Sequence, residues 1–191
     1  MDALPDEALL GARRAALAAH LANAIAIAAL FAFGLATYDG LPARIPAHFD
    51  ASGAPDRWVD KSLLSWLALP LVALGLSALI YGAARIFDWA RKHPRFLNLP
   101  DKERFLALPP ERQAPLWQRG RNLMYWIALP VNGMILYGHW ATWAQATGRC
   151  DALDPLPLFG LLAVTVVGIT LGMLRWIRAI RRAVERSAAP R

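Results

Sequence analysis

The residues best suited to specific chemistry lie in one polar segment, residues 45–61, which combines turn formers with ionisable groups. Its one histidine, His48, is close in sequence to the carboxylates of Asp50 and Asp56. Imidazole and carboxylate groups are suited to binding a metal or to acid–base work. A single histidine with no second one at ligand spacing gives such a site little support. We therefore predict no catalytic residue, no bound metal and no cofactor.

The segment is predicted to form a short β-hairpin. The residues before its turn alternate in a way that suits an extended strand, on which His48 and Asp50 would share one face. Gly53 and its neighbours supply the turn, because glycine adopts a positive φ at little cost. The returning strand would then place Trp58 against Phe49 or against a membrane surface.

The end of the segment leads into the next apolar stretch. Asp60 is placed to cap the exposed amides of a following helix. Lys61 is near enough in sequence to pair with Asp56 or Asp60, and an exposed ion pair is worth at most about 1 kcal/mol. We therefore expect the apolar contacts of Phe49 and Trp58 to hold the hairpin in place.

Three interpretations of this segment stay open. In the first, its polar side chains only satisfy turns, caps and one another. In the second, the exposed face of the hairpin recognises a peptide, a lipid headgroup or a partner protein. In the third, the histidine and the carboxylates bind a metal or perform acid–base work. The ligand-binding residues that we predict for the second interpretation are His48, Phe49, Asp50, Asp56, Trp58 and Lys61.

Four apolar stretches position this segment, and each is long enough to cross a bilayer as a helix. The chain has 191 residues, of which 57% are apolar. A span needs roughly 20 residues at about 1.5 Å each. The sequence thus predicts an all-α membrane protein with four transmembrane helices and a short ordered outer hairpin between the first two. The stretches are approximately Ala15–Tyr38, Leu63–Ile86, Leu123–Trp143 and Leu156–Trp176.

The distribution of basic residues predicts the orientation. If both ends lie inside, the inner segments hold 17 Lys and Arg residues, whereas the two outer loops hold four. Such a bias places both termini in the cytoplasm. It also attributes the net charge of +7 to topology and to anionic membrane lipids rather than to nucleic acid, which we do not expect as a partner.

The predicted organisation has three parts. A cytoplasmic N-terminal tail is followed by the four-helix transmembrane domain, and a basic tail suited to the membrane surface ends the chain. The parts are residues 1–14, 15–176 and 177–191, with an outer loop at 39–62, an inner loop at 87–122 and a second outer loop at 144–155.

Polar and small residues within the spans allow a second class of function. Asn23 and Asn132 lie at similar depths and are predicted to bond to each other. Pro70 and Pro130 end two similar short sequences, residues 66–70 and 126–130. Such repeated sequences occur in the broken helices of transporters. A small transporter or channel-like protein is therefore an alternative. The GxxxG spacing that ends at Gly172 fits either internal packing or a homo-oligomer.

The outer segment also resembles a known family. Its pattern of a proline, a histidine and an aromatic residue, followed by a glycine turn and an Asp-x-Trp, is similar to the bacterial membrane family called domain of unknown function 1648. That family often has Asn at the position of Asp50. The residues that match are Ile45, Pro46, His48, Phe49, Gly53, Asp56, Trp58 and Lys61.

The inner connection resembles a second stretch of four-helix members of that family. Asp101 stands where they have Asn, and Phe105 where they have Trp. The sequence also predicts that Asp101 caps a short helical turn that buries Phe105. The inner-loop motif comprises Asn98, Pro100, Asp101, Lys102 and Glu103.

The resemblance implies an immunity or sensor protein of the bacterial inner membrane. The same domain occurs in relatives of the Sdp immunity protein, which protect a cell from a secreted toxin and can hold a repressor at the membrane. We accordingly expect a protein that is not an enzyme. Its outer hairpin would bind a peptide, lipid or protein ligand, and its basic inner loop would contact a cytoplasmic protein. A transporter is the alternative, and a metal-binding membrane protein is a second one.

Overall fold

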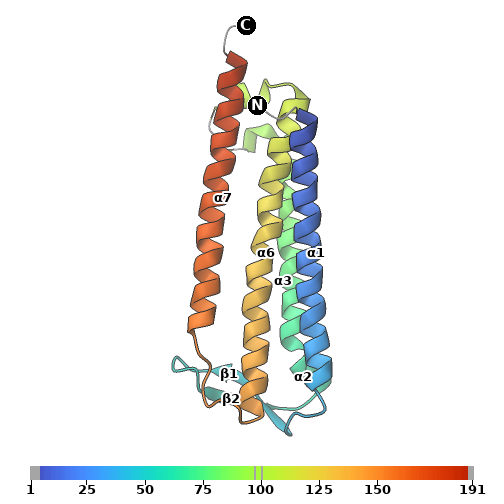
Figure 1. Cartoon of the computed structure of the whole chain (residues 1–191), viewed down its shortest axis with the longest axis vertical. Helices are drawn as coiled ribbons and strands as arrows, with labels where there is room; N and C mark the ends of the chain where they lie inside the picture. Colours follow the sequence, from blue (N-terminus) through green and yellow to red (C-terminus); the bar gives the residue numbers. More distant parts are fainter. Residues whose placement is uncertain (1–4, 97, 100, 189–191) are drawn as a thin grey trace. The chain divides into compact units, whose positions relative to one another are not determined.

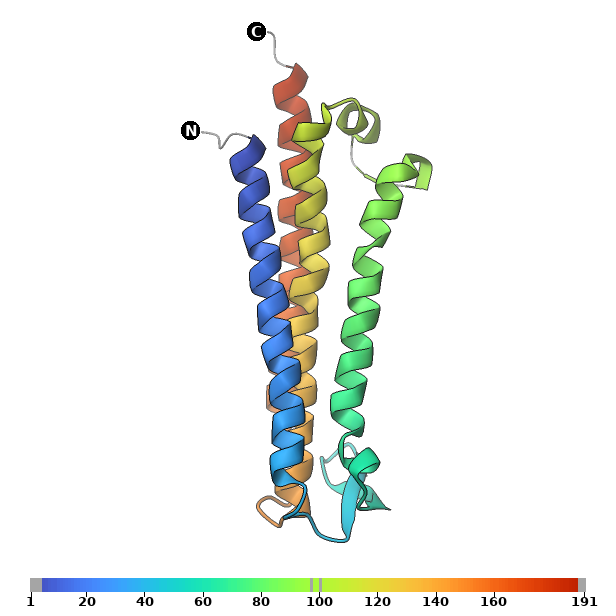
Figure 2. The ribbon, with the colours of Figure 1, turned by 90° about the vertical axis from the view of Figure 1, so that its right-hand side faces the viewer.

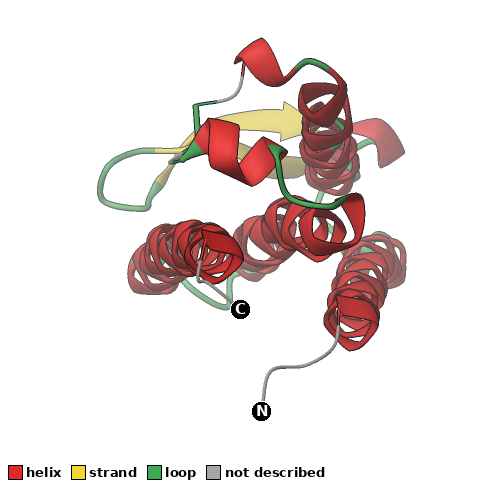
Figure 3. Ribbon diagram, turned by 90° about the horizontal axis from the view of Figure 1, so that it is seen from above, coloured by secondary structure: helices red, strands yellow, loops and turns green. Residues whose placement is uncertain are grey.

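Helices make up most of the chain in the computed structural model, which describes residues 5–96, 98–99 and 101–188 (Figures 1 and 3). The long helices are α1 (Pro5–Thr37), α3 (Ala68–Ala84), α6 (Pro110–Ala146) and α7 (Leu156–Ala188). The short ones are α2 (Leu63–Trp66), α4 (Ile86–Lys92), the 3₁₀ turn η1 (Pro94–Phe96) and α5 (Lys102–Leu106). The strands β1 (Arg44–Phe49) and β2 (Pro55–Asp60) pair in one antiparallel sheet.

Within the described residues, three helical stretches are long and apolar enough to cross a membrane: Asp6–Thr37, Ala68–Lys92 and Leu156–Ala188. They overlap the first, second and fourth predicted spans. The third predicted span lies within α6, where polar side chains such as Asn132 and His139 lower the apolar character. The composition and lengths of the helices thus support a membrane protein, and a fourth span through α6 stays a prediction.

The contacts of the chain divide into two compact units, and each unit contains segments of α1, α3, α6 and α7. Unit 1 consists of Met1–Leu21, Leu79–Ile127 and Val166–Arg191, and unit 2 of Ala22–Ala78 and Ala128–Thr165. These units reflect contacts rather than membrane boundaries. The predicted transmembrane domain and its flanking tails therefore stay predictions.

The core of unit 1 is built around the C-terminal part of α7. On this helix Trp176, Ile180 and Val184 follow one another at four-residue spacing and so share a face. Their face packs against side chains from α5 and α6, and the Trp176 indole donates a hydrogen bond to the Leu116 carbonyl at 2.7 Å. The cluster consists of Phe105, Leu108, Leu116, Trp117, Trp176, Ile180 and Val184.

This packing corrects our picture of the basic tail. Residues 177–188 continue α7, and their apolar face is covered by protein instead of lying on a lipid surface; residues 189–191 lie outside the described part of the chain. The arginines on the remaining faces are exposed: Arg175, Arg178, Arg181, Arg182 and Arg186.

Pro70 and Pro130, which end the two similar short sequences, have different effects on their helices. Pro70 lacks an amide hydrogen, and its ring conflicts with the carbonyl of Trp66, so the helical run is interrupted at Leu67, between α2 and α3. By contrast, α6 continues through Pro130. α6 also begins at Pro110, inside the predicted inner loop, because proline is tolerated in a first helical turn.

We predict that Phe105→Ala destabilises the protein by about 3–5 kcal/mol, because Phe105 is fully buried and its ring meets Trp117 edge to face. The matched control is Phe96→Ala in the same connection, whose side chain is 59% exposed. We expect that change to cost about 0.5 kcal/mol or less. Denaturant unfolding in detergent micelles measures both, and equal losses would contradict this description of the core.

Candidate functional site

The hairpin formed by β1, β2 and the turn between them is irregular in both strands, since the register skips one residue of β1 and also Asp56 of β2. Ile45 pairs with Val59 and Pro46 with Trp58, but the next pair is His48 with Arg57, so Ala47 is skipped. Such a bulge breaks the strict alternation of side chains. Ile45 and Pro46 are accordingly both buried, although they are neighbours.

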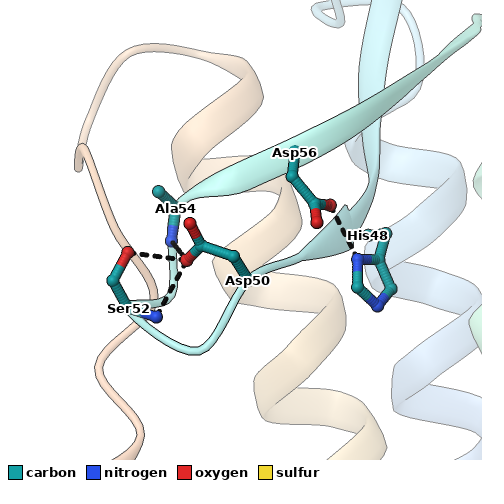
Figure 4. Close-up of polar contacts among 5 residues, drawn as sticks. All are labelled: His48, Asp50, Ser52, Ala54 and Asp56. Carbon is teal, nitrogen blue, oxygen red and sulfur yellow. Dashed lines mark hydrogen bonds and ion pairs between the residues drawn. The ribbon is translucent and has the colours of Figure 1, made fainter.

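The turn is organised by Asp50, which lies just after β1 (Figure 4). One carboxylate oxygen accepts hydrogen bonds from the Ser52 hydroxyl at 2.6 Å, the Ser52 amide at 2.8 Å and the Ala54 amide at 3.0 Å. These bonds, the Ser52 hydroxyl first, hold the pKa of Asp50 below its usual 3.8. An asparagine side-chain oxygen could accept the same bonds. Asp50 is therefore a turn residue, and the predicted shared face with His48 does not form.

His48 and Asp56 form an ion pair across the hairpin (Figure 4). The imidazole Nδ1 lies 2.6 Å from a carboxylate oxygen of Asp56, and the two side chains are 59% and 46% exposed. When Nδ1 donates this bond, Nε2 points away as an acceptor. Within the described residues, no group of three or more His, Cys, Asp or Glu side chains is placed to hold a metal ion. The pair is therefore an exposed polar group on the surface of the hairpin.

The turn is also fixed to another part of unit 2 through Gly53. Its carbonyl accepts hydrogen bonds from the Leu153 amide at 2.8 Å and from the Gln145 side chain at 3.0 Å. Its φ is +82°, and a Cβ placed there would lie 2.2 Å from the Leu153 carbonyl oxygen. Only glycine satisfies both conditions. Sequence reasoning missed Gln145 and Leu153, since no local pattern connects them to residue 53.

The base of the hairpin rests on an apolar cluster. The short helix α2 lies beside the hairpin (Figure 2). Leu41, Ile45 and Trp66 are its buried members, and Val59 of β2 packs against them. The Trp66 indole donates a hydrogen bond of 2.7 Å to the Gly34 carbonyl at the end of α1. The hairpin is therefore held at its base by apolar contacts and at its turn by hydrogen bonds.

Three sequence predictions about this hairpin were wrong in detail. Trp58 lies opposite Pro46 rather than Phe49 and is 37% exposed, while the predicted alternative, packing against a membrane surface, stays a prediction. Lys61 donates instead to the carbonyls of Asp39 at 3.3 Å and Leu41 at 3.1 Å, with its ammonium group 4.7 Å from the centre of the Tyr38 ring. Lys61 thus braces the connection from α1, and it meets neither of the aspartates predicted for it.

The third correction concerns the helix cap. Ser62, and not Asp60, caps α2, because its hydroxyl accepts from the Ser65 amide at 3.0 Å while the Ser65 hydroxyl accepts from the Ser62 amide. The Asp60 carbonyl accepts a bond from the Ser65 hydroxyl. Asp60 therefore supports the start of α2 through its backbone carbonyl and not through its carboxylate.

Asn23 and Asn132, which we predicted to lie within the membrane, take part in a buried chain of hydrogen bonds in unit 2. The Asn132 amide donates to the Asn23 oxygen at 3.0 Å, and the Ser77 hydroxyl donates to the Asn132 oxygen at 3.2 Å. The three side chains are 0–6% exposed. They link α1, α3 and α6, and the Asn132 oxygen and one hydrogen of its amide are already used by protein partners.

The inner-loop motif lies in unit 1. Asp101 adopts a φ of +51°, which asparagine and aspartate tolerate better than most residues, and it precedes α5 without a side-chain cap. The Lys102 ammonium group donates to the Arg95 carbonyl at 3.3 Å, and Asn98 is exposed. Pro100 lies outside the described residues. A surface hollow of about 460 Å³ is lined by Asp101, Lys102, Glu103 and Arg104.

We predict that Gly53→Ala releases the turn and raises the rate of limited proteolysis within residues 50–56 by roughly tenfold or more, because the added Cβ would collide with Leu153. Gly148→Ala is the matched control. Gly148 also has a positive φ, +69°, but a Cβ there meets nothing within 4 Å. The control therefore isolates backbone strain, and equally fast cleavage within 50–56 in both variants would argue against a docked turn.

Comparisons with known proteins find a family that is similar to the hairpin and its flanking helices. Residues 25–74, from α1 through the hairpin to α3, match the family model described as "Domain of unknown function (DUF1648)". An uncharacterized protein of Archaeoglobus fulgidus is 40% identical over 79 residues, which cover 41% of this chain and 42% of that protein. The chain therefore matches less than half the length of this relative. No solved structure matches the chain. Residues 25–74 of this chain are thus similar to the family of domain of unknown function 1648.

Proposed function

We propose that this chain is a non-enzymatic binding protein of the membrane, of the immunity or sensor type, with the hairpin as its recognition surface. One observation carries the proposal: the hairpin is held at both ends, yet it leaves a polar and aromatic surface exposed. Gly53 holds the turn and Ile45 the base, while His48, Asp56 and Trp58 stay accessible. A surface that is ordered before binding loses little conformational freedom when a ligand arrives.

The exposed residues favour a peptide or protein ligand over a purely apolar one. The ion pair of His48 and Asp56 supplies one donor–acceptor pair, Arg57 adds a positive charge, and Trp58 offers a large partly apolar ring. Tryptophan and arginine are the side chains that most often dominate interface energetics. Phe49, Asp50 and Lys61 belong to the framework of this surface instead.

We further propose four spans with both termini in the cytoplasm of a bacterial inner membrane. The bias of basic residues supports this orientation, since unit 2 carries only Arg44, Arg57, Lys61 and Arg149. The exposed arginines at the end of α7 would then face the inner leaflet, where each attracts anionic headgroups by about 1 kcal/mol.

A cytoplasmic protein would contact the inner connection near α5. The hollow lined by Asp101, Lys102, Glu103 and Arg104 offers both charge signs on a short helix that Phe105 fixes in the core. The hairpin would bind its ligand and the surface near α5 would bind a cytoplasmic protein, and neither binding event requires the other.

A small transporter is the alternative that the buried asparagines favour. Asn132 is fully buried at mid-span, but it bonds to Asn23 and Ser77, and α6 is not broken at Pro130. The geometry therefore supports interhelical bonding, worth roughly 0.6–2 kcal/mol per pair. It offers less support to a substrate site.

The orientation can be tested by labelling single cysteines in a Cys150→Ala background. We expect a membrane-impermeant maleimide to reach Ala51→Cys in intact cells and Glu103→Cys only after permeabilisation, because both side chains are exposed but on opposite sides of the proposed membrane. Ala51 is chosen over Gly53, which has no room for a side chain. The opposite labelling pattern would reverse the topology.

The binding function can be tested by comparing what co-purifies with the wild type and with three variants, using quantitative mass spectrometry. We expect His48→Ala and Trp58→Ala each to reduce recovery of a specific peptide or protein at least tenfold, since truncating a central contact typically costs 1.4 kcal/mol or more, about tenfold in affinity. Asn132→Ala should leave recovery of that species unchanged. A species lost only in Asn132→Ala would favour the transporter instead.

A further inference from the structure

An exposed group of aromatic side chains in unit 1 belongs to neither of the proposed binding surfaces. It lies on α4 and η1, where the apolar helical stretch Ala68–Lys92 ends. The Trp89 ring stacks with the His93 ring, with 4.6 Å between ring centres, and with the Phe96 ring, with 5.2 Å. Trp89 and Phe96 are 47% and 59% exposed, and His93 is exposed as well. Contiguous exposed apolar surface of this kind often marks a site of interaction.

The opposite face of α4 is fixed to the rest of unit 1. Phe87 packs against the core cluster of this unit, with its ring centre 5.7 Å from that of Trp176, and Ala90 is buried. The Arg121 guanidinium donates to both carboxylate oxygens of Asp88 at 2.9 Å. The helix therefore cannot turn its aromatic face inward without breaking these contacts.

The aromatic rings are also held in place by polar groups. The His93 Nδ1 lies 3.0 Å from the Trp89 carbonyl and must donate this bond, because a carbonyl oxygen only accepts. The Arg95 guanidinium lies 4.7 Å from the centre of the Phe96 ring, a cation–π distance, and the Arg95 carbonyl accepts a bond from Lys102 of α5. The surface is thus ordered before a ligand arrives, so binding costs little conformational freedom.

The charge of this segment is positive. Residues 85–96 contain four Lys or Arg side chains and a single carboxylate, that of Asp88, which already pairs with Arg121. A partner that fits this surface must therefore be anionic. The four cations are all exposed: Arg85, Arg91, Lys92 and Arg95.

Three of these cations lie on the side of the aromatic rings. Arg85, which precedes α4 as its N-cap with helical φ and ψ, is followed by Trp89 and Lys92 at spacings of four and three residues. Residues at these spacings share one face of a helix. Arg95 reaches the same rings through its contact with Phe96. Positive charge and aromatic surface are therefore combined in one place.

A phospholipid with an anionic headgroup has both of the properties that this surface requires. Its phosphate accepts hydrogen bonds from guanidinium and ammonium groups, and its glycerol region lies at the level where tryptophan is enriched in membrane proteins. The rings lie where the apolar stretch Ala68–Lys92 ends, which is where a spanning helix leaves the hydrocarbon. A soluble phosphate compound would use the cations but would leave the rings without a partner.

We propose that this face of α4 and η1 binds the headgroup of an anionic phospholipid, with the phosphate on the cations and the rings beside the glycerol region. The proposal rests on the stretch Ala68–Lys92 lying in a membrane. It depends neither on the orientation of the chain nor on the ligand of the hairpin. The binding face consists of Arg85, Ile86, Trp89, Lys92, Arg95 and Phe96.

Native mass spectrometry of the full chain, released from neutral detergent micelles, tests the proposal. The probes are phosphatidylglycerol and phosphatidylcholine with identical acyl chains, and the measured quantity is the dissociation constant of the first bound lipid. We expect the wild type to bind phosphatidylglycerol at least about tenfold more tightly, since each nearby cation favours an anionic lipid by about fivefold. Equal affinity for the two lipids would overturn the proposal and would leave the surface to a protein partner.

Charge variants locate the site. Replacing the three cations of the face by glutamine should reduce the preference for phosphatidylglycerol to about twofold or less. The matched control removes the same number of exposed charges from α7 and should keep most of the preference. A loss that is equal in both variants, or larger in the control, would contradict a site on α4. The test changes are Arg85→Gln, Lys92→Gln and Arg95→Gln, and the control changes are Arg178→Gln, Arg181→Gln and Arg182→Gln.

Two further measurements test the role of the rings and of the acyl chains. Trp89→Ala should weaken phosphatidylglycerol binding about tenfold, whereas Trp140→Ala, which removes a ring that is 45% exposed on α6, should leave it unchanged. Equal effects would remove the rings from the site, and the charge variants keep the test valid if Trp89→Ala does not fold. Glycerol phosphate, which carries the phosphate without acyl chains, should not displace the lipid. Displacement would instead indicate a site for a soluble phosphate compound.

Discussion

The geometry of the hairpin surface depends on one backbone carbonyl, that of Gly53. It receives hydrogen bonds from Leu153 and Gln145, about a hundred residues further along the chain, and so joins the hairpin turn to the connection between α6 and α7. A two-stranded hairpin alone is marginally stable in water. This one becomes a fixed surface because its turn is bonded to the unit that also supports its base. The positive φ and the close approach of Leu153 explain why the residue must be glycine.

The base and the turn of the hairpin are held by different forces. At the base, Ile45 and Trp66 bury apolar surface, which contributes roughly 1.5–3 kcal/mol for each large side chain. At the turn, Asp50 and Gly53 rely on hydrogen bonds, each worth about 0.5–1.5 kcal/mol net. The exposed pair of His48 and Asp56 adds little stability by comparison. The groups most available to a ligand are thus the ones that the fold needs least.

The sequence was sufficient to predict features that depend on neighbouring residues. It was not sufficient to predict features that depend on contacts between residues far apart in the chain. Hydropathy located the apolar helices, and turn residues located the hairpin. The depth of Asn23 and Asn132 predicted the bond that joins them. The roles of Trp58 and Lys61 were wrong, because a bulge shifted the register and because carbonyls near Leu41 compete for the ammonium group. Gln145, Leu153 and His139 left no local pattern from which their contacts could be predicted.

His139 differs from the hydrogen-bonded chain of Asn23, Asn132 and Ser77, because neither of its ring nitrogens has a hydrogen-bond partner among the described residues. Asn23, Asn132 and Ser77 show that buried polar groups in this unit can find partners when they serve only to join helices. An imidazole left unpaired beside Gly34 is therefore not a general property of the packing. A leucine or phenylalanine in its place would fill an apolar site at no polar cost. The histidine therefore makes this part of unit 2 less stable than an apolar side chain of similar size would.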